Sequence, residues 1–362
     1  MEEEIHNFIK VWATIFLSLS FCHYMAKITP KGPTRLLFIA PTLCLFLCLP
    51  LRLHTVHLGG MTSFFIAWLA NFKLLLFAFG RGPLSPPPPS SSPISLPHFI
   101  AIACLPLKVS PSPKVDENRV RPPPEKKSPL NYVAKAAIYV SLSWVYDWGA
   151  HLHPKFILFV YFLHIYCFLD VSLTVFGAVA RVAIGSGLEP PFNEPYLSTS
   201  LQDFWGRRWN LTVSSILRPA VYDPALALLE GVLGLRWARL AGIWATFVVS
   251  ALMHELMFFY LGRQRPTWEI SWFFILHGAC LMAEVGVKKA AEHGGVTWRP
   301  PRVAANVATV AFVLATGFWL FFPQLIRCGV DVRGIEEYEA AGAFVRGFFR
   351  ERFSAARWTV GI

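Results

Sequence analysis

The stretch VVSALMHELMFF, residues Val248–Phe259, places a histidine beside a glutamate in an otherwise apolar run. Its polar residues are Ser250, His254 and Glu255. An ionisable side chain at the depth of a bilayer is costly and is normally kept for a function. The imidazole of His254 can take a proton from a hydroxyl group near neutral pH. This segment therefore predicts acid–base chemistry inside a membrane.

Helical spacing surrounds His254 with small and apolar side chains, whereas Glu255 points about 100° away and is expected to pair with basic residues of a neighbouring helix. The HE pair is not a zinc-protease motif, because Phe258 stands where a second histidine is required, and we predict no metal site. His277 and His164 also lie in apolar runs. A lone intramembrane histidine often makes only a structural hydrogen bond. Of the three histidines, His254 is favoured, followed by His277.

The second candidate element is Ser200–Arg218, within a longer inter-span region. On a helix, Trp205 and Trp209 fall on one side and a polar strip falls on another. The strip consists of Asp203, Arg207, Asn210, Ser214 and Arg218. This pattern predicts an amphipathic helix at the membrane surface, aromatic side down. A helix that only anchors the loop, with its arginines on lipid phosphate, is the alternative, and the amide in the strip argues against it.

Composition indicates a membrane protein. The 362 residues are 54% hydrophobic and only 15% charged, against about 25% charged residues in soluble domains. The net charge is +11, and the basic residues gather between apolar runs, where they can meet lipid head groups or an anionic substrate. No zinc-finger spacing or basic helix is present, so nucleic acid is not expected as a partner.

Apolar runs of about 20 residues cross a bilayer as helices. The sequence therefore predicts an all-α, multi-pass integral membrane protein with about eight transmembrane helices and a cytosolic amphipathic helix. The expected spans are Phe8–Met25, Leu36–Leu53, Met61–Phe79, Leu130–Trp148, Lys155–Val179, Arg236–Tyr260, Trp268–Val287 and Val303–Ile326. Alternate loops carry most of the basic residues, which places residues 180–235 in the cytosol.

The chain lacks the GxSxG, HxxxxD, GxGxxG and Walker patterns. A neutral histidine in a dry cavity can act as a base on an alcohol. A nearby asparagine or arginine can hold the acyl carbonyl or the acyl carrier. These features predict direct transfer of an acyl group to an alcohol, without a covalent enzyme intermediate.

Three blocks carry a resemblance to a known family: EPYLSTSLQDFWGRRWNLTVSSILRPAVYDP, VVSALMHELMFFYLGRQRPTWE and GPLSP…SLPHFIAIACLPLK. They resemble the plant wax synthases, which are related to the membrane-bound O-acyltransferases. Those enzymes esterify long-chain fatty alcohols with acyl-CoA, and close relatives acylate sterols. The resemblance implies an MBOAT-like fold in which His254 and Asn210 face the reaction chamber and acyl-CoA enters from the cytosol.

The expected function is transfer of a fatty acyl group from acyl-CoA, as co-substrate and with no cofactor, to a long-chain fatty alcohol at the endoplasmic reticulum membrane. A wax ester forms and CoA is released. His254 is the expected general base, and Asn210 is expected to orient the thioester carbonyl or the imidazole. A sterol is the alternative acceptor. A lipid transporter with a His254–Glu255 proton relay is the alternative from another class.

Further substrate contacts are expected around the same block. Arg207, Arg208 and Arg218 are predicted to bind CoA phosphate, with Asp203 and Trp209 as additional acyl-CoA contacts. The expected organisation is N-terminal transmembrane helices over residues 1–79 and a Pro/Ser-rich cytosolic loop over residues 80–129. The loop contains a re-entrant or interfacial piece at residues 94–107. An acyltransferase core over residues 130–326 and a tail over residues 327–362 follow.

Overall fold

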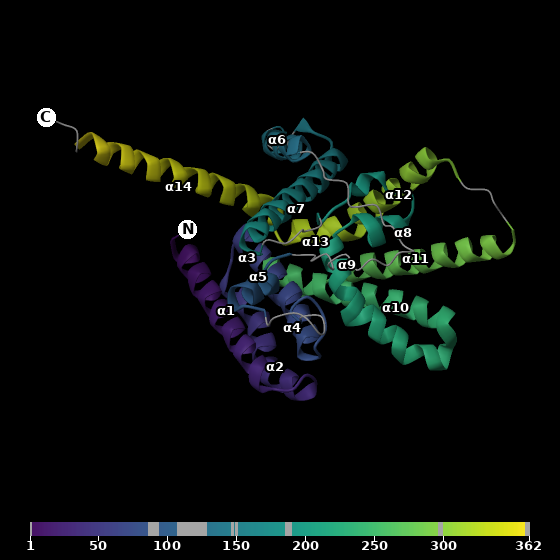
Figure 1. Cartoon of the computed structure of the whole chain (residues 1–362). Coiled ribbons are helices and arrows are strands. Elements are labelled where there is room, and N and C mark those ends of the chain that lie inside the picture. The colour runs from purple at the N-terminus through teal and green to yellow at the C-terminus, as the bar shows by residue number, and fades with distance from the viewer. Residues whose placement is uncertain are drawn as a thin grey trace.

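Helices form nearly all of this computed structural model, which describes residues 2–85, 94–106, 129–145, 148, 151–184, 190–295 and 300–358. These residues contain no β-strand. Seven of their helical rods are long and apolar enough to cross a membrane. The predicted all-α, multi-pass architecture is therefore confirmed (Figure 1).

The helices near the N-terminus are α1 (Glu2–Ile28), α2 (Pro33–Cys48), α3 (Val56–Ser63), α4 (Asn71–Ala78) and α5 (Leu96–Cys104). The central ones are α6 (Pro129–Val145), α7 (Pro154–Ile184), α8 (Leu201–Asp203), α9 (Leu211–Leu217) and α10 (Asp223–Gly262). The last are α11 (Glu269–His293), α12 (Arg302–Thr316), α13 (Phe322–Arg327) and α14 (Val330–Trp358). Short 3₁₀ turns are η1 (Leu49–Arg52) and η4 (Pro195–Leu197), and π-helical turns are η2 (Phe64–Ala70), η5 (Phe204–Arg208), η6 (Arg218–Tyr222) and η7 (Gly317–Phe321).

All eight predicted spans fall on helices, but α6 has only 17 residues, with its apolar part at Val133–Leu142, and is too short to count among the seven. An ion pair inside the bundle holds α6 against α7. It joins Lys135 Nζ to Asp170 Oδ2 over 2.5 Å, and both side chains are buried. Buried charges persist when they are paired in this way.

The segment at residues 94–107 contains α5, whose nine residues are too few to cross a bilayer. The carbonyl groups at its C-terminal end accept hydrogen bonds from a buried lysine. Lys73 Nζ lies 2.7 Å from the oxygen of Ile102 and 2.6 Å from that of Leu105. This lysine ties the end of α5 to the rod α3–η2–α4. Most of the Pro/Ser-rich loop lies outside the described residues.

The predicted continuous helix over Ser200–Arg218 is wrong, because the chain breaks near its middle. Trp209 is extended and Asn210 is left-handed, with φ 37° and ψ 64°. Neighbouring backbone causes the break, since the amide of Asn193 donates to Arg208 and the amide of Leu211 donates to Pro191. The tryptophans consequently are half-buried and pack on other aromatic side chains of the protein, Trp205 on Phe247 and Trp209 on Phe204.

The helix α10 begins at Asp223, well before the predicted start at Arg236. Gly234, with φ 74° and ψ 158°, breaks this helix in a conformation that residues with a Cβ rarely adopt. The two parts fold back as a hairpin, visible in Figure 1. Tyr222 packs so closely on Gly242 that a Cβ there would lie 2.9 Å from the tyrosine ring.

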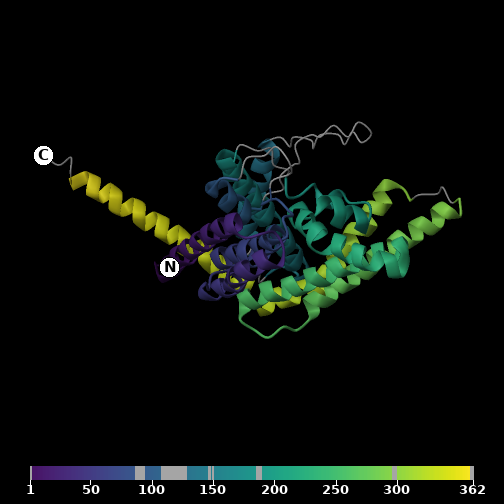
Figure 2. The same cartoon turned by 60° about the horizontal axis from the view of Figure 1, so that its bottom comes forward.

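Residues 327–362 were expected to be a tail, but most of them form α14. Figures 1 and 2 show this helix leaving the bundle beside the N-terminal end of α1. Its first turns are fixed to that end of the bundle by polar contacts to backbone. Arg333 donates to the carbonyl oxygens of His54 and Leu261, and Glu4 of α1 accepts from the amides of His54 and Thr55.

Candidate active site

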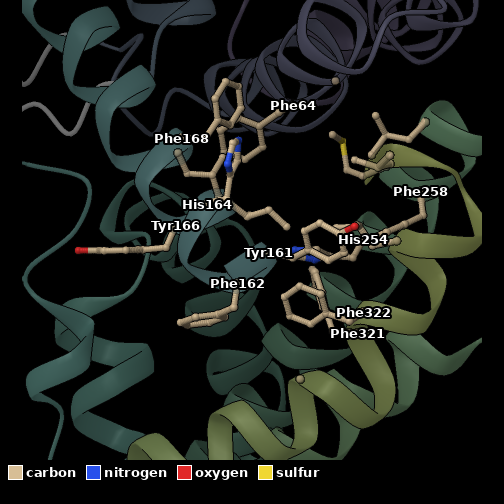
Figure 3. A pocket seen from close by; sticks show the side chains of 18 of the residues that line it. Phe64, Tyr161, Phe162, His164, Tyr166, Phe168, His254, Phe258, Phe321 and Phe322 are labelled. Atoms are coloured by element: carbon tan, nitrogen blue, oxygen red, sulfur yellow. The ribbon is translucent and has the colours of Figure 1, made fainter. Parts of the chain in front are cut away.

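A cavity of about 320 Å³ lies between the helices and is bounded mostly by aromatic side chains. Its wall is built by α3 with η2, α7, the block around η5, α10, α11, η7 with α13, and the start of α14. Both His254 and Asn210 line it. Figure 3 shows His254 among phenylalanine side chains that point into this space. We call this cavity the chamber.

His254 is held in one orientation by its own helix. Its Nδ1 lies 2.7 Å from the carbonyl oxygen of Ser250. A carbonyl oxygen only accepts, so Nδ1 carries the proton and the neutral ring has its lone pair on Nε2. The rings of Trp68 and Phe274 pack on the imidazole, with centroids 4.9 and 4.2 Å away. The base-competent nitrogen therefore belongs to a fixed tautomer in apolar surroundings.

Asn210 reaches the chamber because the chain breaks there. It is the N-cap of α9, and its Oδ1 accepts a hydrogen bond from the amide of Val213 over 3.3 Å. Asparagine suits both tasks, since it caps helices well and tolerates the left-handed conformation. The cap uses the side-chain oxygen, and within the described part of the chain no hydrogen bond involves Nδ2. The amide group retains two donors at the chamber wall.

Three π-helical segments contribute to the chamber. They supply Trp68 from η2, Phe204 and Trp205 from η5, and Gly317 and Phe321 from η7. π-Helical turns are rare and are often found at functional sites. Trp209 also lines the chamber, stacked on Phe204 at 5.3 Å. The aromatic block singled out in the sequence is therefore a wall of the chamber.

His277 lies outside the wall of the chamber and has a structural role. It is fully buried, and its Nδ1 accepts a hydrogen bond from Trp205 Nε1 over 3.1 Å. Its Nε2 therefore carries the proton and donates to Thr316 Oγ1 over 2.8 Å. Both ring nitrogens are occupied, so His277 supports Trp205 from behind.

Glu255 was expected to pair with basic residues, and that expectation is wrong. Its Oε1 accepts hydrogen bonds from the backbone amide and the hydroxyl group of Ser271, over 3.1 and 3.0 Å. Ser271 lies in the first turn of α11, where a carboxylate satisfies free amides and complements the helix dipole. Glu255 is not part of the chamber wall, so the described residues do not form a His254–Glu255 relay.

The charged residues of the aromatic block divide into two groups. Asp203 and Arg208 pair with each other, Nε to Oδ2, over 2.7 Å, and Arg208 also donates to the carbonyl groups of Asn193 and Glu194. They hold the loop together and do not line the chamber. Arg207 is exposed, and Arg218 is 73% exposed and 3.7 Å from Asp223. Arg207 and Arg218 are thus open to solvent, whereas Arg208 is bonded within the loop, and the phosphate role of all three stays a prediction.

A second polar group lies at the chamber, and no sequence motif marks it as a site. We call it the distal cluster. It consists of His57, His164 and Tyr338, which line the chamber, and of Tyr139 and Glu337, which hydrogen-bond to Tyr338 and His57. His57 Nδ1 lies 2.7 Å from Glu337 Oε2, and His57 Nε2 lies 2.6 Å from Tyr338 Oη. Its members come from α3, α6, α7 and α14, so no local pattern links them. Its sequence signals are His164, in an apolar run, and His57 at the start of the α3 rod.

Comparison with known proteins decides the family. Over 338 residues, the chain is 45% identical to acyl-CoA–sterol O-acyltransferase 1 of Arabidopsis thaliana, covering 93% of this chain and 96% of the relative. Residues 188–276 match the model of the membrane bound O-acyl transferase family. The chain belongs to the membrane-bound O-acyltransferases. It is thus an acyltransferase, as the resemblance implied.

Two further relatives of this O-acyltransferase are named for long-chain alcohols as acceptors instead of sterols. The long-chain-alcohol O-fatty-acyltransferase of Simmondsia chinensis is 44% identical over 342 residues, covering 93% of this chain and 95% of the relative. The probable long-chain-alcohol O-fatty-acyltransferase 3 of Arabidopsis thaliana is 42% identical over 350 residues, covering 96% and 98%. The resemblance to the wax synthase group is therefore confirmed over nearly the whole chain.

Replacing His277 of this O-acyltransferase by leucine should reduce stability and spare the chemistry. Trp205 and Thr316 would lose their shared partner, which should lower the free energy of unfolding by about 1–3 kcal/mol. Thermal unfolding in detergent and ester formation per folded molecule measure the two effects. Loss of turnover in a variant with unchanged stability would contradict the structural role.

Proposed function

We propose that the chain transfers a fatty acyl group from acyl-CoA to the hydroxyl group of a long-chain alcohol, giving a wax ester and free CoA. The observation that carries this proposal is the shared chamber, in which His254 has an Nε2 lone pair and Asn210 keeps amide donors. The names of the long-chain-alcohol relatives support the acceptor class. No cofactor besides the co-substrate enters the proposal.

In the proposed reaction, His254 Nε2 takes the proton of the alcohol as its oxygen attacks the thioester carbonyl carbon. The carbonyl oxygen becomes negatively charged, and the Asn210 amide donates to it. The carbon–sulfur bond then breaks. The imidazolium returns its proton to the CoA sulfur, so the enzyme ends unchanged. Because Oδ1 of Asn210 caps α9, we assign Asn210 to the carbonyl rather than to the imidazole.

We propose that Arg207 and Arg218, exposed beside the Asn210 end of the chamber, contact the phosphate groups of CoA. Replacing Arg207 by alanine should raise the KM for acyl-CoA about three- to tenfold and change kcat less, because a contact made equally in the ground and transition states mainly affects KM. Steady-state kinetics with varied acyl-CoA measure both values.

Arg52, an exposed arginine at the end of the bundle near the start of α14, is the matched control. Its alanine variant should leave the KM for acyl-CoA unchanged. A fall in kcat at unchanged KM in the Arg207 variant would contradict a phosphate contact.

A sterol is the second candidate acceptor, because a relative named for sterol acylation is as similar to the chain as those named for long-chain alcohols. Microsomes that contain the chain, given labelled acyl-CoA with hexadecanol, a sterol or diacylglycerol, separate these acceptors. We expect labelled hexadecyl ester. Label in sterol ester alone would move the assignment to the sterol, and label in neither would reject both.

We propose the endoplasmic reticulum membrane as the location, with the Asn210 end of the chamber toward the cytosol. With α6 counted as a span, the distribution of basic residues among the loops supports this orientation. Acyl-CoA would then enter at the Asn210 end, and the alcohol would come from the bilayer. Protease or glycosylation mapping of residues 190–200 tests the orientation, and a lumenal result would reverse it.

A further inference from the structure

The distal cluster lies toward the end of the chamber away from Trp205 and Asn210. Helix α10 sets the scale, because its Phe247 packs on Trp205 with centroids 5.6 Å apart, whereas its Leu261 accepts a hydrogen bond from Arg333 of α14. The helical rise between Phe247 and Leu261 is about 21 Å. His254 lies midway, about 10 Å along the axis from the level of α14. Trp68 packs on His254, and His57 of the distal cluster lies eleven residues earlier in the same helical rod. A single hydroxyl group therefore cannot touch His254 and His57 at once.

Fixing α14 does not require the tyrosine of the cluster. The carboxylate of Glu337 accepts from the backbone amides of Val56 and His57 and from the His57 ring. Burial alone would raise the pKa of Glu337, but these hydrogen bonds outweigh it and hold the pKa below its ordinary value. Arg333 adds bonds to two backbone carbonyls. Ionised Glu337 and Arg333 therefore attach α14 to α3 and α10.

Tyr338 and His164 add hydrogen-bonding groups that line the chamber itself. Since Glu337 accepts from His57 Nδ1, His57 Nε2 accepts the Tyr338 hydroxyl proton over 2.6 Å. The Tyr338 oxygen then accepts the hydroxyl proton of Tyr139, and its remaining lone pair faces His164 Nε2, 3.4 Å away. That contact is longer than an ordinary hydrogen bond. An incoming hydroxyl can accept from His164 and donate to Tyr338 with better geometry than the direct contact has.

A lipid alcohol that enters the chamber needs hydrogen-bonding partners for its hydroxyl group. Its hydroxyl loses free energy when it enters an apolar space without partners. Apart from the Tyr161 hydroxyl, which donates to Asp331 over 3.3 Å, the wall around His164 and His254 is largely aromatic hydrocarbon (Figure 3). The distal cluster supplies polar partners before the hydroxyl reaches the catalytic histidine.

We propose that His164 and Tyr338 form a first binding site for the hydroxyl group of an uncharged lipid alcohol, which then moves along the chamber to His254. The site adds a selective step to the proposed function, on which it rests, because it recognises the hydroxyl and not the hydrocarbon chain. Tyr338 and His164 are thereby positioning residues of the acceptor.

Equilibrium binding of labelled hexadecanol without acyl-CoA tests this site directly. The parent for this measurement is the His254→Ala variant, in which the catalytic base is absent. Adding Tyr338→Phe to it should weaken hexadecanol binding about five- to tenfold, because one hydrogen bond is lost. Hexadecyl methyl ether cannot donate a hydrogen bond, so it should bind more weakly to the parent and lose no further affinity in the double variant. Equal hexadecanol affinities, or equal losses for alcohol and ether, would overturn the proposal.

Tyr260→Phe is the matched control, because it removes a hydroxyl that bonds the carbonyl oxygen of Leu47, away from the chamber. It should leave hexadecanol binding unchanged. In the otherwise wild-type enzyme, Tyr338→Phe should raise the KM for the alcohol about five- to tenfold, with kcat and the KM for acyl-CoA unchanged. An equal change in all three constants would indicate only a loosened α14 and would overturn the site.

The binding measurement involves no turnover, so its outcome is independent of ester formation. If the wild-type chain forms no ester from hexadecanol, the proposed function fails, while the affinity difference still reports on the distal site. If ester forms and the affinity difference is absent, only the distal site is rejected.

Discussion

Replacing His254 by alanine should lower wax ester formation by about 10²–10⁴-fold, the usual contribution of a general base. His254 is the histidine on the chamber wall whose Nδ1 is bonded to a backbone carbonyl, which leaves Nε2 to accept the alcohol proton. Its ring packs on Trp68 and Phe274, and among the described residues it makes no hydrogen bond to another side chain, so the loss of stability should be small. Labelled acyl-CoA and hexadecanol, with the amount of folded protein measured in parallel, provide the test.

Two controls separate chemistry from general damage. His293→Ala changes an exposed histidine at the end of α11 and should retain full activity. His254→Gln keeps a polar side chain of similar size but cannot act as a base at neutral pH, so it should be as inactive as the alanine variant. Wild-type turnover in His254→Ala would remove His254 from the mechanism.

Replacing Asn210 by aspartate should lower kcat about 10²–10³-fold, as expected for loss of an oxyanion donor. Aspartate caps helices as well as asparagine does and tolerates the left-handed backbone, so α9 should form normally. The change removes the amide donors and places a negative charge where the carbonyl oxygen develops one. Single-turnover rates and thermal unfolding distinguish lost catalysis from lost folding.

Asn210→Gly completes the test, because glycine accepts a φ of 37° but supplies no donor. It should be as slow as the aspartate variant and less stable by a few tenths of a kcal/mol to about 1 kcal/mol, from the lost cap. If the aspartate variant turns over at the wild-type rate, the amide group is not the donor and Asn210 serves only to cap α9.

For the aromatic block, the sequence pattern identified residues of the chamber wall but predicted the wrong backbone conformation. The periodicity of Ser200–Arg218 predicted one amphipathic helix, yet backbone hydrogen bonds from Asn193 and to Pro191 break it at Trp209 and Asn210. Those bonds join residues that helical periodicity does not relate. The break puts both residues on the chamber wall, whereas an unbroken surface helix would have placed Trp209 on the lipid side and Asn210 in the polar strip.

Histidine assignment also depended on tertiary contacts. Sequence position left His254, His277 and His164 as alternatives, since all three lie in apolar helices. Their partners separate them. His277 uses both ring nitrogens for Trp205 and Thr316, His164 contacts Tyr338, and His254 alone of the three bonds its own helix carbonyl.

The amino-acid sequence was sufficient for most of the membrane spans, for the family and for the choice of His254 and Asn210 as candidates. The length of apolar runs, the helical period and short motifs are local properties of the sequence. In a bilayer such runs form helices, because every backbone polar group must be hydrogen-bonded within the segment. The shape of the chamber was decided by packing. The break at Asn210, the role of Glu255 on α11 and the contribution of Tyr338 from the C-terminal helix all arise from segments far apart in the chain. Contacts of that kind depend on how helices meet in space, which no periodicity within one helix encodes.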